Sequence, residues 1–416
     1  MKTEQSGCWV GVDWGGREHA VCVVGSDGTK RAQWRIRHEA AAVKGLPAQL
    51  GAFGPILGVA LETPRHVLVD VLTQAGFPVY PVNPKLSKRW RDCASVAGAK
   101  DDDRDAWVLA DGLRCHHGKL RPFVPAPASM RTLALLCADE CRLIGERTAL
   151  VQQLEAALKQ YFPAALEWFT DWTTQTAWDF VGAFPTAAAL AAARPSHLVS
   201  FLRTHRMALK PQWQERIACR QAALEWPCDP ALAAAKAVLA ESLVKQLRTL
   251  DASLKRYRKE IELLFAHCEN KEVFTSLPGA GRKLAPRLAC LFGGQSDPME
   301  SAEDVQKLAG TAPVTIQSGN TRRVRMRRAC RKNARNALHQ FAEHSIRRSA
   351  WARALYDRAR RQGQKHASAL RLVANKWLKI IYRMWQTGEP YDESRYLAQL
   401  VKKKSPLAYQ LGLLKT

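Results

Sequence analysis

Two long segments of helical hydrophobic periodicity set the limits on how this chain can fold. They run from Ser129 to about Phe162 and from roughly Pro230 to Cys268. Leu, Ala and Val recur at helical spacing in both, and Arg, Lys and Glu fill the other faces. Two such helices pack most simply as a long antiparallel coiled-coil arm. We therefore expect an arm over residues 126–269, with a small helical insertion at about 165–228 that is rich in Trp, Pro and Ala.

Residues 1–125 follow a different pattern, in which β-rich runs precede and alternate with helical stretches. Apolar residues alternate with polar ones, or run uninterrupted, in five short segments: CWVGVDWG, HAVCVVG, KRAQWRIRH, ILGVALET and FPVYPVN. The GRE between the first two is typical of a hairpin, and helical stretches fall between the last of them. The pattern predicts an α/β domain with a mixed sheet.

The C-terminal portion, residues 270–395, is expected to be mainly helical, with a basic tail at 396–416. The stretch LPGAGRKLAPRLACLFG contains a turn at Pro278–Gly281, followed by an apolar helix stripe. A helix, this turn and a second helix would form a helix-hairpin-helix whose free backbone N–H groups can hold a phosphate. Gly-rich helix connections also occur without any ligand. The residues expected to bind nucleic acid here are Gly279, Gly281, Arg282 and Lys283.

The charge of the chain indicates a polyanionic partner. Its 416 residues carry a formal net charge of +25 with a pI near 9.9, and 47% hydrophobic residues mark a folded globular protein. DNA and RNA fit this charge. A membrane partner is disfavoured because no apolar run reaches the ~18 residues that a spanning helix needs. The start, MKTEQSGCW, lacks the apolar core of a signal peptide, so we expect a cytoplasmic protein.

A single serine, Ser318, precedes the most basic stretch of the sequence. Eight Arg or Lys residues lie between Arg322 and Arg335, and no carboxylate occurs from Val305 to Ala342. An ordinary Ser-Gly turn before a nucleic-acid-binding face accounts for this pattern without any catalysis. The residues expected to meet phosphates are Arg322, Arg323, Arg325, Arg327, Arg328 and Arg331.

Four carboxylates are candidates for one metal site. Asp13 ends the first apolar strand and Glu62 ends one that is expected to neighbour it, while Asp102 and Asp105 begin a helix one turn before its buried face. Carboxylates gathered in one cleft need cations to offset their repulsion, and all-oxygen ligands favour Mg²⁺ or Mn²⁺. Alternatively, these acids cap helices or lie on the surface.

Asp101 is the alternative ligand to Asp102, because it lies one helical turn before Asp105; Asp103 should lie further round the helix. The cysteines offer a second, weaker metal candidate. Cys137 and Cys141 could hold two positions of a zinc site with Cys115, His116 and His117, but no CxxC pair occurs. The eleven cysteines are read as reduced thiols, and this pair as small apolar residues on a helix face.

The order of these motifs resembles that of the DEDD insertion-sequence transposases, the bridge-RNA-guided recombinases. Asp13, Glu62, Asp102 and Asp105 match the carboxylates of the family's ribonuclease H-like, RuvC-type domain. LPGAGRKLAPRLACLFG, KLAGTAPVTIQSGN and the basic run RRVRMRRACRKNAR follow in the order of its C-terminal transposase domain. One departure is Asp101, where the family usually has Ser or Thr. The resemblance covers nearly the whole chain.

The resemblance implies a concrete mechanism. Ser318 would attack a DNA phosphodiester and form a phosphoserine intermediate, while the four carboxylates hold Mg²⁺ or Mn²⁺. Arginines would stabilise charge on the phosphate, and exchange of one ester for another would need no ATP. It also implies donor and target DNA, a guide (bridge) RNA, and a homo-oligomer, dimer or tetramer, with composite active sites. The setting implied is the nucleoid of a bacterial or archaeal cell.

Three classes of function remain open at this point. The first is a serine-using, metal-dependent DNA recombinase. The second is a metal-dependent nuclease or junction resolvase that uses water, with Ser318 as a turn residue. The third is a nucleic-acid-binding scaffold, which would explain the charge but not the carboxylates.

Overall fold

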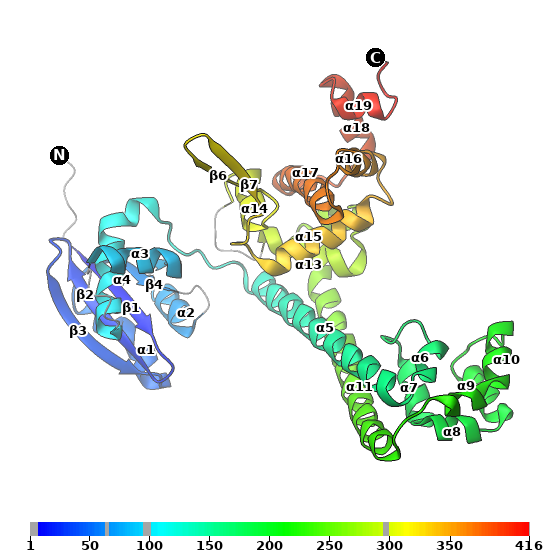
Figure 1. The fold of residues 1–416 in the computed structure, drawn as a ribbon. Coiled ribbons are helices and arrows are strands. Elements are labelled where there is room, and N and C mark those ends of the chain that lie inside the picture. The colour runs from blue at the N-terminus through cyan, green and yellow to red at the C-terminus, as the bar shows by residue number, and fades with distance from the viewer. Residues whose placement is uncertain (1–6, 63–65, 95–100, 294–298, 416) are drawn as a thin grey trace. The chain divides into compact units, whose positions relative to one another are not determined.

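The computed structural model describes residues 7–62, 66–94, 101–293 and 299–415. The chain forms two compact units: the first ends at Ala126 and the second begins at Pro127 (Figure 1). The first unit holds a five-stranded sheet with helices on both faces, and the second is helical apart from one small hairpin. A mixed α/β region followed by a mostly helical region is therefore confirmed.

All five predicted strands are present in the first unit. Their order across the sheet is β3-β2-β1-β4-β5. β1 pairs antiparallel with β2, and β2 with β3, whereas β1–β4 and β4–β5 are parallel, so the sheet is mixed as expected. The strands are β1 Cys8–Trp14, β2 Glu18–Gly25, β3 Lys30–Arg37, β4 Ile56–Leu61 and β5 Val79–Pro81.

Helices cover the two faces of this sheet. α1 and α2 pack on one face, where Leu46 and Leu68 join Val10 and Val12 of β1 in one buried cluster. α4 packs on the other face, with α3 beside it. A side chain at Gly11 would lie 2.0 Å from the Ala106 carbonyl oxygen of α4, so only glycine permits this approach. The helices are α1 Ala40–Gly51, α2 Val67–Gln74, α3 Pro84–Ala94, α4 Asp102–His116 and a 3₁₀ turn His117–Lys119.

Two long helices begin the second unit, close to the predicted ranges. α5 spans Ala128–Tyr161 and α11 spans Pro230–Ala266. They pack against each other along their length. They run antiparallel, since Glu140 of α5 pairs with Arg258 of α11, whereas Arg147, later in α5, pairs with Asp251, earlier in α11. The two lie side by side in Figure 1.

Short helices between α5 and α11 enclose an aromatic core. Trp168, Trp178, Phe180 and Trp213 are buried there with leucines from both long helices, which explains the Trp-rich composition of this insertion. The elements are α6 Ala164–Trp168, α7 Gln175–Ala183, α8 Ala187–Ala192, α9 Pro195–Thr204, α10 Pro211–Ala218 and a 3₁₀ helix Arg220–Glu225.

The remaining helices form a second large core around Trp351, Trp377 and Phe341. Residues 396–416 were expected as a basic tail, but the described part, 396–415, joins this core, since Leu400 and Leu407 are buried in it. The elements are α12 Lys271–Thr275, α13 Gly281–Gly293, α14 Ala302–Leu308, β6 Val314–Ser318, β7 Thr321–Arg325, α15 Lys332–Ser345, α16 Ala350–Arg361, α17 His366–Thr387, α18 Glu393–Lys402 and α19 Pro406–Gln410.

A buried carboxylate joins the long helices to this core. Glu140 of α5 is 2% exposed and accepts hydrogen bonds from Arg258 of α11 at 3.1 Å and from Arg287 of α13 at 2.8 Å. Both carboxylate oxygens are thus satisfied by charged donors, which is what a buried acid requires.

Candidate active site and nucleic-acid interface

The sheet places Asp13 and Glu62 at the same edge. β1 and β4 are parallel and pair as far as the end of β4, where Leu61 lies opposite Val12. Asp13 is the penultimate residue of β1, and Glu62 directly follows β4. Two carboxylates therefore leave neighbouring strands at the edge where the carboxyl ends of parallel strands meet, which is where α/β sheets bind ligands.

Asp13 and Glu62 also share one face of the sheet. Gly11 and Ala60, two residues earlier on each strand, lie against the side that α4 covers. Because alternate residues point to the same face, Asp13 and Glu62 face α4 as well. Asp105, in the first turns of α4, is only 4% exposed and packs toward the sheet. Three of the four predicted carboxylates thus belong to one side of one domain.

Helix α3 contributes two side chains that sequence reasoning missed. The buried Ser87 hydroxyl donates a short hydrogen bond to Oε1 of Glu62, and Arg91 Nε lies 2.5 Å from Oδ1 of Asp105. Ser87 and Arg91 are one helical turn apart, on the side of α3 that buries Trp90. In the sequence, the available signal for these two residues was their spacing of one helical turn beside an apolar Trp, which places them on one face of the helix.

The carboxylate oxygens fit a hard divalent cation. Arg91 Nε and Asp105 Oδ1 are close, yet both atoms are buried and neither has a hydrogen-bond partner, so their contact is a charge pairing without an aligned hydrogen bond. A buried carboxylate oxygen of this kind has a lone pair available to another ligand. Glu62, Asp13 and Asp105 supply only oxygen, the donor that Mg²⁺ and Mn²⁺ prefer.

The acidic residues at the start of α4 differ in their exposure and in their partners. Asp102 is exposed at the first turn, although it was expected to face the sheet with Asp105. Asp103 pairs with Arg35 of β3 at 3.0 Å, further round the helix as expected, and Asp101 lies 3.6 Å from the same arginine. Asp101 is therefore drawn toward β3, and the choice between Asp101 and Asp102 as a ligand stays a prediction.

The carboxylates are not gathered as tightly as a bound ion would hold them. In the part of the chain that the structure describes, the group whose ligand atoms lie within 4.8 Å of one another is formed by three histidines, His19, His38 and His66. Arg91 beside Asp105 and Ser87 beside Glu62 take up the interactions that a cation would otherwise make.

Ser318 ends the first strand of an exposed hairpin. β6 and β7 pair antiparallel, with Ser318 opposite Thr321, and Gly319 has a φ of +53° between them. A two-residue turn that begins with a positive φ requires glycine at that position. Sequence reasoning predicted a turn here but not the strands, although Gly-Asn between two alternating runs is a hairpin signal.

The basic residues that follow lie on and after this hairpin. Arg322, Arg323 and Arg325 on β7 are exposed, as is Arg328, whereas Arg327 is half-buried and Arg331 begins α15. An exposed serine thus stands at the tip of a hairpin whose second strand presents three arginines to solvent.

The Pro278–Gly281 turn connects α12 to α13 as predicted, although α12 is only five residues long. Gly279 has a φ of +89° and packs on α15, where its carbonyl lies 3.2 Å from His344 Nδ1. Gly281 has a φ of +56° with open space around it, and Arg282 and Lys283 are exposed beside it. Phosphate binding by this helical hairpin stays a prediction.

Comparison with known proteins decides the family. A DEDD transposase model of the IS110 type, described as "Transposase", matches residues 10–163, and the model "Transposase IS116/IS110/IS902 family" matches residues 271–357. The first match contains the four carboxylates, and the second contains the Pro-Gly turn and Ser318. The chain belongs to the IS110 family of DEDD transposases.

Relatives cover this IS110-family transposase almost end to end. It is 28% identical over 403 residues to the "Mini-circle putative transposase for IS117" of Streptomyces coelicolor, which covers 94% of this chain and 97% of the relative. It is 27% identical over 391 residues to the "Insertion element IS900 uncharacterized 42 kDa protein" of Mycobacterium paratuberculosis, 92% of this chain and 96% of the relative. The "Putative transposase y4uE" of Sinorhizobium fredii is 33% identical over 213 residues, 49% of this chain and 58% of the relative.

Membership in this family gives the transposase a DNA substrate and a strand-cleaving, strand-transferring activity. DEDD transposases normally use a divalent metal. In the described parts of the chain, no helix is long and apolar enough to cross a membrane.

The exposed hairpin arginines of the transposase give a first testable prediction. Replacing Arg322 and Arg323 with alanine is expected to weaken DNA binding and to flatten its salt dependence by up to about 0.9 log units per log unit of salt for each lost phosphate contact. Fluorescence anisotropy with a labelled duplex at several salt concentrations measures both quantities.

Arg142→Ala is the matched control for this experiment. It removes the same charge from an exposed position on α5, but Arg142 is already flanked by Asp139 at 3.8 Å and Glu146 at 3.6 Å. Its salt slope should equal that of the unmodified protein. An unchanged slope in the double hairpin variant would show that the hairpin does not contact DNA.

Proposed function

We propose that this transposase recombines DNA by RNA-guided strand cleavage and exchange through a phosphoserine intermediate at Ser318. The observation that carries the proposal is the position of that hydroxyl, exposed at the tip of a hairpin whose second strand is arginine-rich, in a stretch without any carboxylate from Val305 to Ala342. Nothing negative in this stretch competes with a DNA phosphate for the arginines.

The reaction is a transesterification. The Ser318 oxygen forms a bond to phosphorus while the bond from phosphorus to the leaving DNA hydroxyl breaks; the serine proton is taken up by a base and the leaving oxygen gains a proton. A second DNA hydroxyl reverses the step on the new strand. The number of phosphate ester bonds does not change, so no ATP is needed.

A serine hydroxyl needs activation that its own surroundings do not supply. The sequence around it offers arginines to stabilise phosphate charge but no Asp, Glu or His until His339. Asp13, Glu62, Asp102 and Asp105 would hold Mg²⁺ or Mn²⁺, which when bound stabilises the attacking and leaving oxygens of a phosphodiester. Ser318 and these carboxylates belong to different compact units.

We further propose that the active sites are composite and assembled in a homo-oligomer, a dimer or tetramer. The antiparallel α5–α11 pair would serve as the coiled-coil arm that brings subunits together. The Pro278–Gly281 turn, acting as a helix-hairpin-helix, would hold a DNA phosphate near the basic hairpin. Such an enzyme acts on chromosomal DNA, which places it at the nucleoid.

A water-using nuclease of the RuvC type is the second candidate. The buried carboxylate of Asp105 supports it, since a metal site in the first unit alone would be enough to activate water. It differs from the first candidate in leaving no protein on the DNA.

The guide is proposed to be a noncoding RNA encoded beside the gene and bound by the first unit and the arm. The net charge of +25 is spread over both the arm and the C-terminal domain, which is more surface than one short DNA duplex would cover, and this spread supports a second nucleic acid. Purified protein stripped of RNA by nuclease and high salt is expected to lose recombination of donor and target DNA, and to regain it when the copurifying RNA is added back.

An unrelated structured RNA of the same length is the control for the add-back. Equal recombination with and without RNA would refute guidance by RNA, while leaving the serine chemistry to be judged by its own test.

A further inference from the structure

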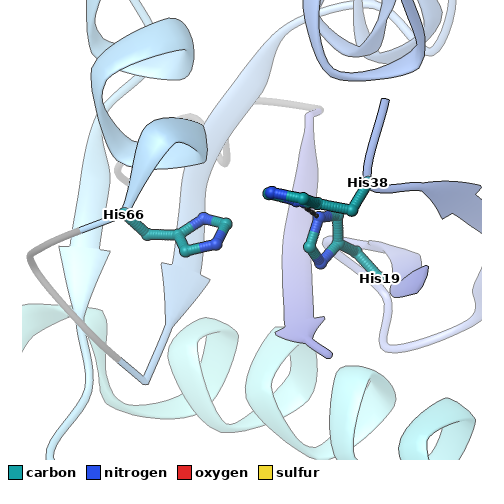
Figure 2. Close-up of side chains that lie close together, drawn as sticks. All are labelled: His19, His38 and His66. Atoms are coloured by element: carbon teal, nitrogen blue, oxygen red, sulfur yellow. Dashed lines mark hydrogen bonds between the residues drawn. The ribbon is translucent and has the colours of Figure 1, made fainter. Parts of the chain in front are cut away.

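Three histidines from separate elements converge on the face of the sheet opposite the carboxylates (Figure 2). His19 is the second residue of β2, His38 directly follows β3, and His66 directly precedes α2. His19 shares its face with Val21 and Val23, which pack against α1 and α2, whereas Ala20 lies on the α4 side. The cluster is therefore separate from Asp13 and Glu62.

The nitrogens of the three rings are close enough to share an ion. One nitrogen from each lies within 4.8 Å of the others, and His19 Nε2 is 2.9 Å from His38 Nδ1. In a tetrahedral zinc site, with zinc–nitrogen bonds of about 2.1 Å, neighbouring nitrogens lie about 3.4 Å apart. Small side-chain rotations would bring the three nitrogens to that spacing.

Hydrogen bonding within the domain does not use up these rings. His66 Nδ1 accepts from the Leu68 backbone N–H at 3.3 Å, which caps α2 and leaves Nε2 for another ligand. His19 is fully buried, and its Nδ1 has no hydrogen-bond partner. Because Nε2 of His19 faces His38, it is the nitrogen of this ring that would coordinate an ion.

Two of the rings, His19 and His66, are also in the protonation state that metal binding needs. Burial, with His66 and His38 nearby, lowers the pKa of His19, and burial, with His38 nearby, lowers the pKa of His66. Both rings are therefore neutral near pH 7 and keep a lone pair. Imidazole nitrogen suits Zn²⁺ and similar transition metals, whereas Mg²⁺ prefers oxygen.

We infer that His19, His38 and His66 form a transition-metal site of the Zn²⁺ class, with solvent in the remaining position. On binding, the proton shared between His19 and His38 moves to the outer nitrogen of its ring, so that neutral imidazoles coordinate. The ion ties β2 and the end of β3 to the start of α2, which lies just beyond Glu62 in the sequence. Its role is to hold this edge of the sheet in place.

Cobalt is the probe for this site, since Co²⁺ replaces Zn²⁺ and its visible spectrum reports geometry and ligands. Full-length protein is titrated with Co²⁺ in excess Mg²⁺, which occupies the carboxylates. We expect one Co²⁺ per chain with a tetrahedral spectrum, displaced by Zn²⁺. Absence of the near-ultraviolet thiolate charge-transfer band separates this site from the eleven cysteines.

The double variant His38→Ala/His66→Asn tests the ligands without disturbing the core. His38 is exposed, and Asn is a strong helix N-cap, so α2 keeps its cap. Its affinity for Co²⁺ should fall by more than about tenfold. His197→Ala, an exposed histidine of α9, should bind as the unmodified protein does.

Equal Co²⁺ binding by the double variant and the unmodified protein would overturn the proposal. An octahedral Co²⁺ spectrum that is the same in the unmodified protein, the double variant and His197→Ala would also overturn it. Circular dichroism of each variant establishes that any loss of binding occurs in folded protein.

Discussion

Ser318→Ala is expected to abolish covalent attachment of the protein to DNA and to reduce strand exchange by roughly 10⁴–10⁶-fold, the cost of removing a nucleophile. Binding of DNA, RNA and Mg²⁺ should be retained, because the hairpin turn depends on Gly319 and not on the hydroxyl. End-labelled DNA run on a denaturing gel, with and without protease, reveals the adduct directly.

Thr321→Ala is the matched control. Thr321 is the cross-strand partner of Ser318 on the same exposed hairpin and carries the same functional group, so its loss should leave the adduct intact. Full DNA cleavage by Ser318→Ala would rule out the serine mechanism and favour a nuclease that uses water. Ser318→Cys should show little or no activity, because a thiolate prefers softer metals than Mg²⁺.

The second large effect is expected at the carboxylates. Asp105→Asn keeps the volume of a buried side chain but removes its charge, and should lower metal-dependent strand cleavage by more than about 10²-fold, since even outer partners of a metal ligand contribute 10–100-fold. Cleavage measured over a range of Mg²⁺ and Mn²⁺ concentrations tests this, and circular dichroism tests folding.

Variants of two neighbouring residues test the same assignment. Asp103→Asn removes a charge from the same helical turn, but Asp103 pairs with Arg35 near the surface, so activity should persist. Arg91→Gln removes the cation beside Asp105 and should shift cleavage to lower Mg²⁺ concentrations. Retained activity in Asp105→Asn, or loss in Asp103→Asn, would contradict the assignment.

Much of the first unit could be predicted from sequence because its strands are buried. Apolar runs ending in Asp13 and Glu62 gave both the strands and the edge at which they end, since acids are depleted within strands. The position of Asp105 facing the sheet was predicted from helical periodicity. Periodicity suggested that Asp102 faces the sheet, but its side chain is exposed, because Asp105 and not Asp102 takes the buried position in the first turns of α4.

The parts that could not be predicted depend on long-range contacts or on exposed strands. β6 and β7 bury almost nothing, so no buried apolar run marked them, and their register is set by the turn at Gly319. Ser87 and Arg91 meet the carboxylates only through the packing of α3. His19, His38 and His66 lie far apart in sequence with no motif spacing, and only the sheet brings them together.

Glu140 has a mechanical consequence. Swinging the α5–α11 pair about its base would separate this buried carboxylate from Arg287, and removing a partner from a buried ion pair typically costs about 3–5 kcal/mol. The ion pairs of Glu140 therefore hold the α5–α11 pair firmly against α13 and the C-terminal core. Any reorientation during strand exchange is then expected at positions away from this contact. Glu140→Gln weakens the ion pairs and is expected to make the junction between the long helices and the C-terminal core more mobile.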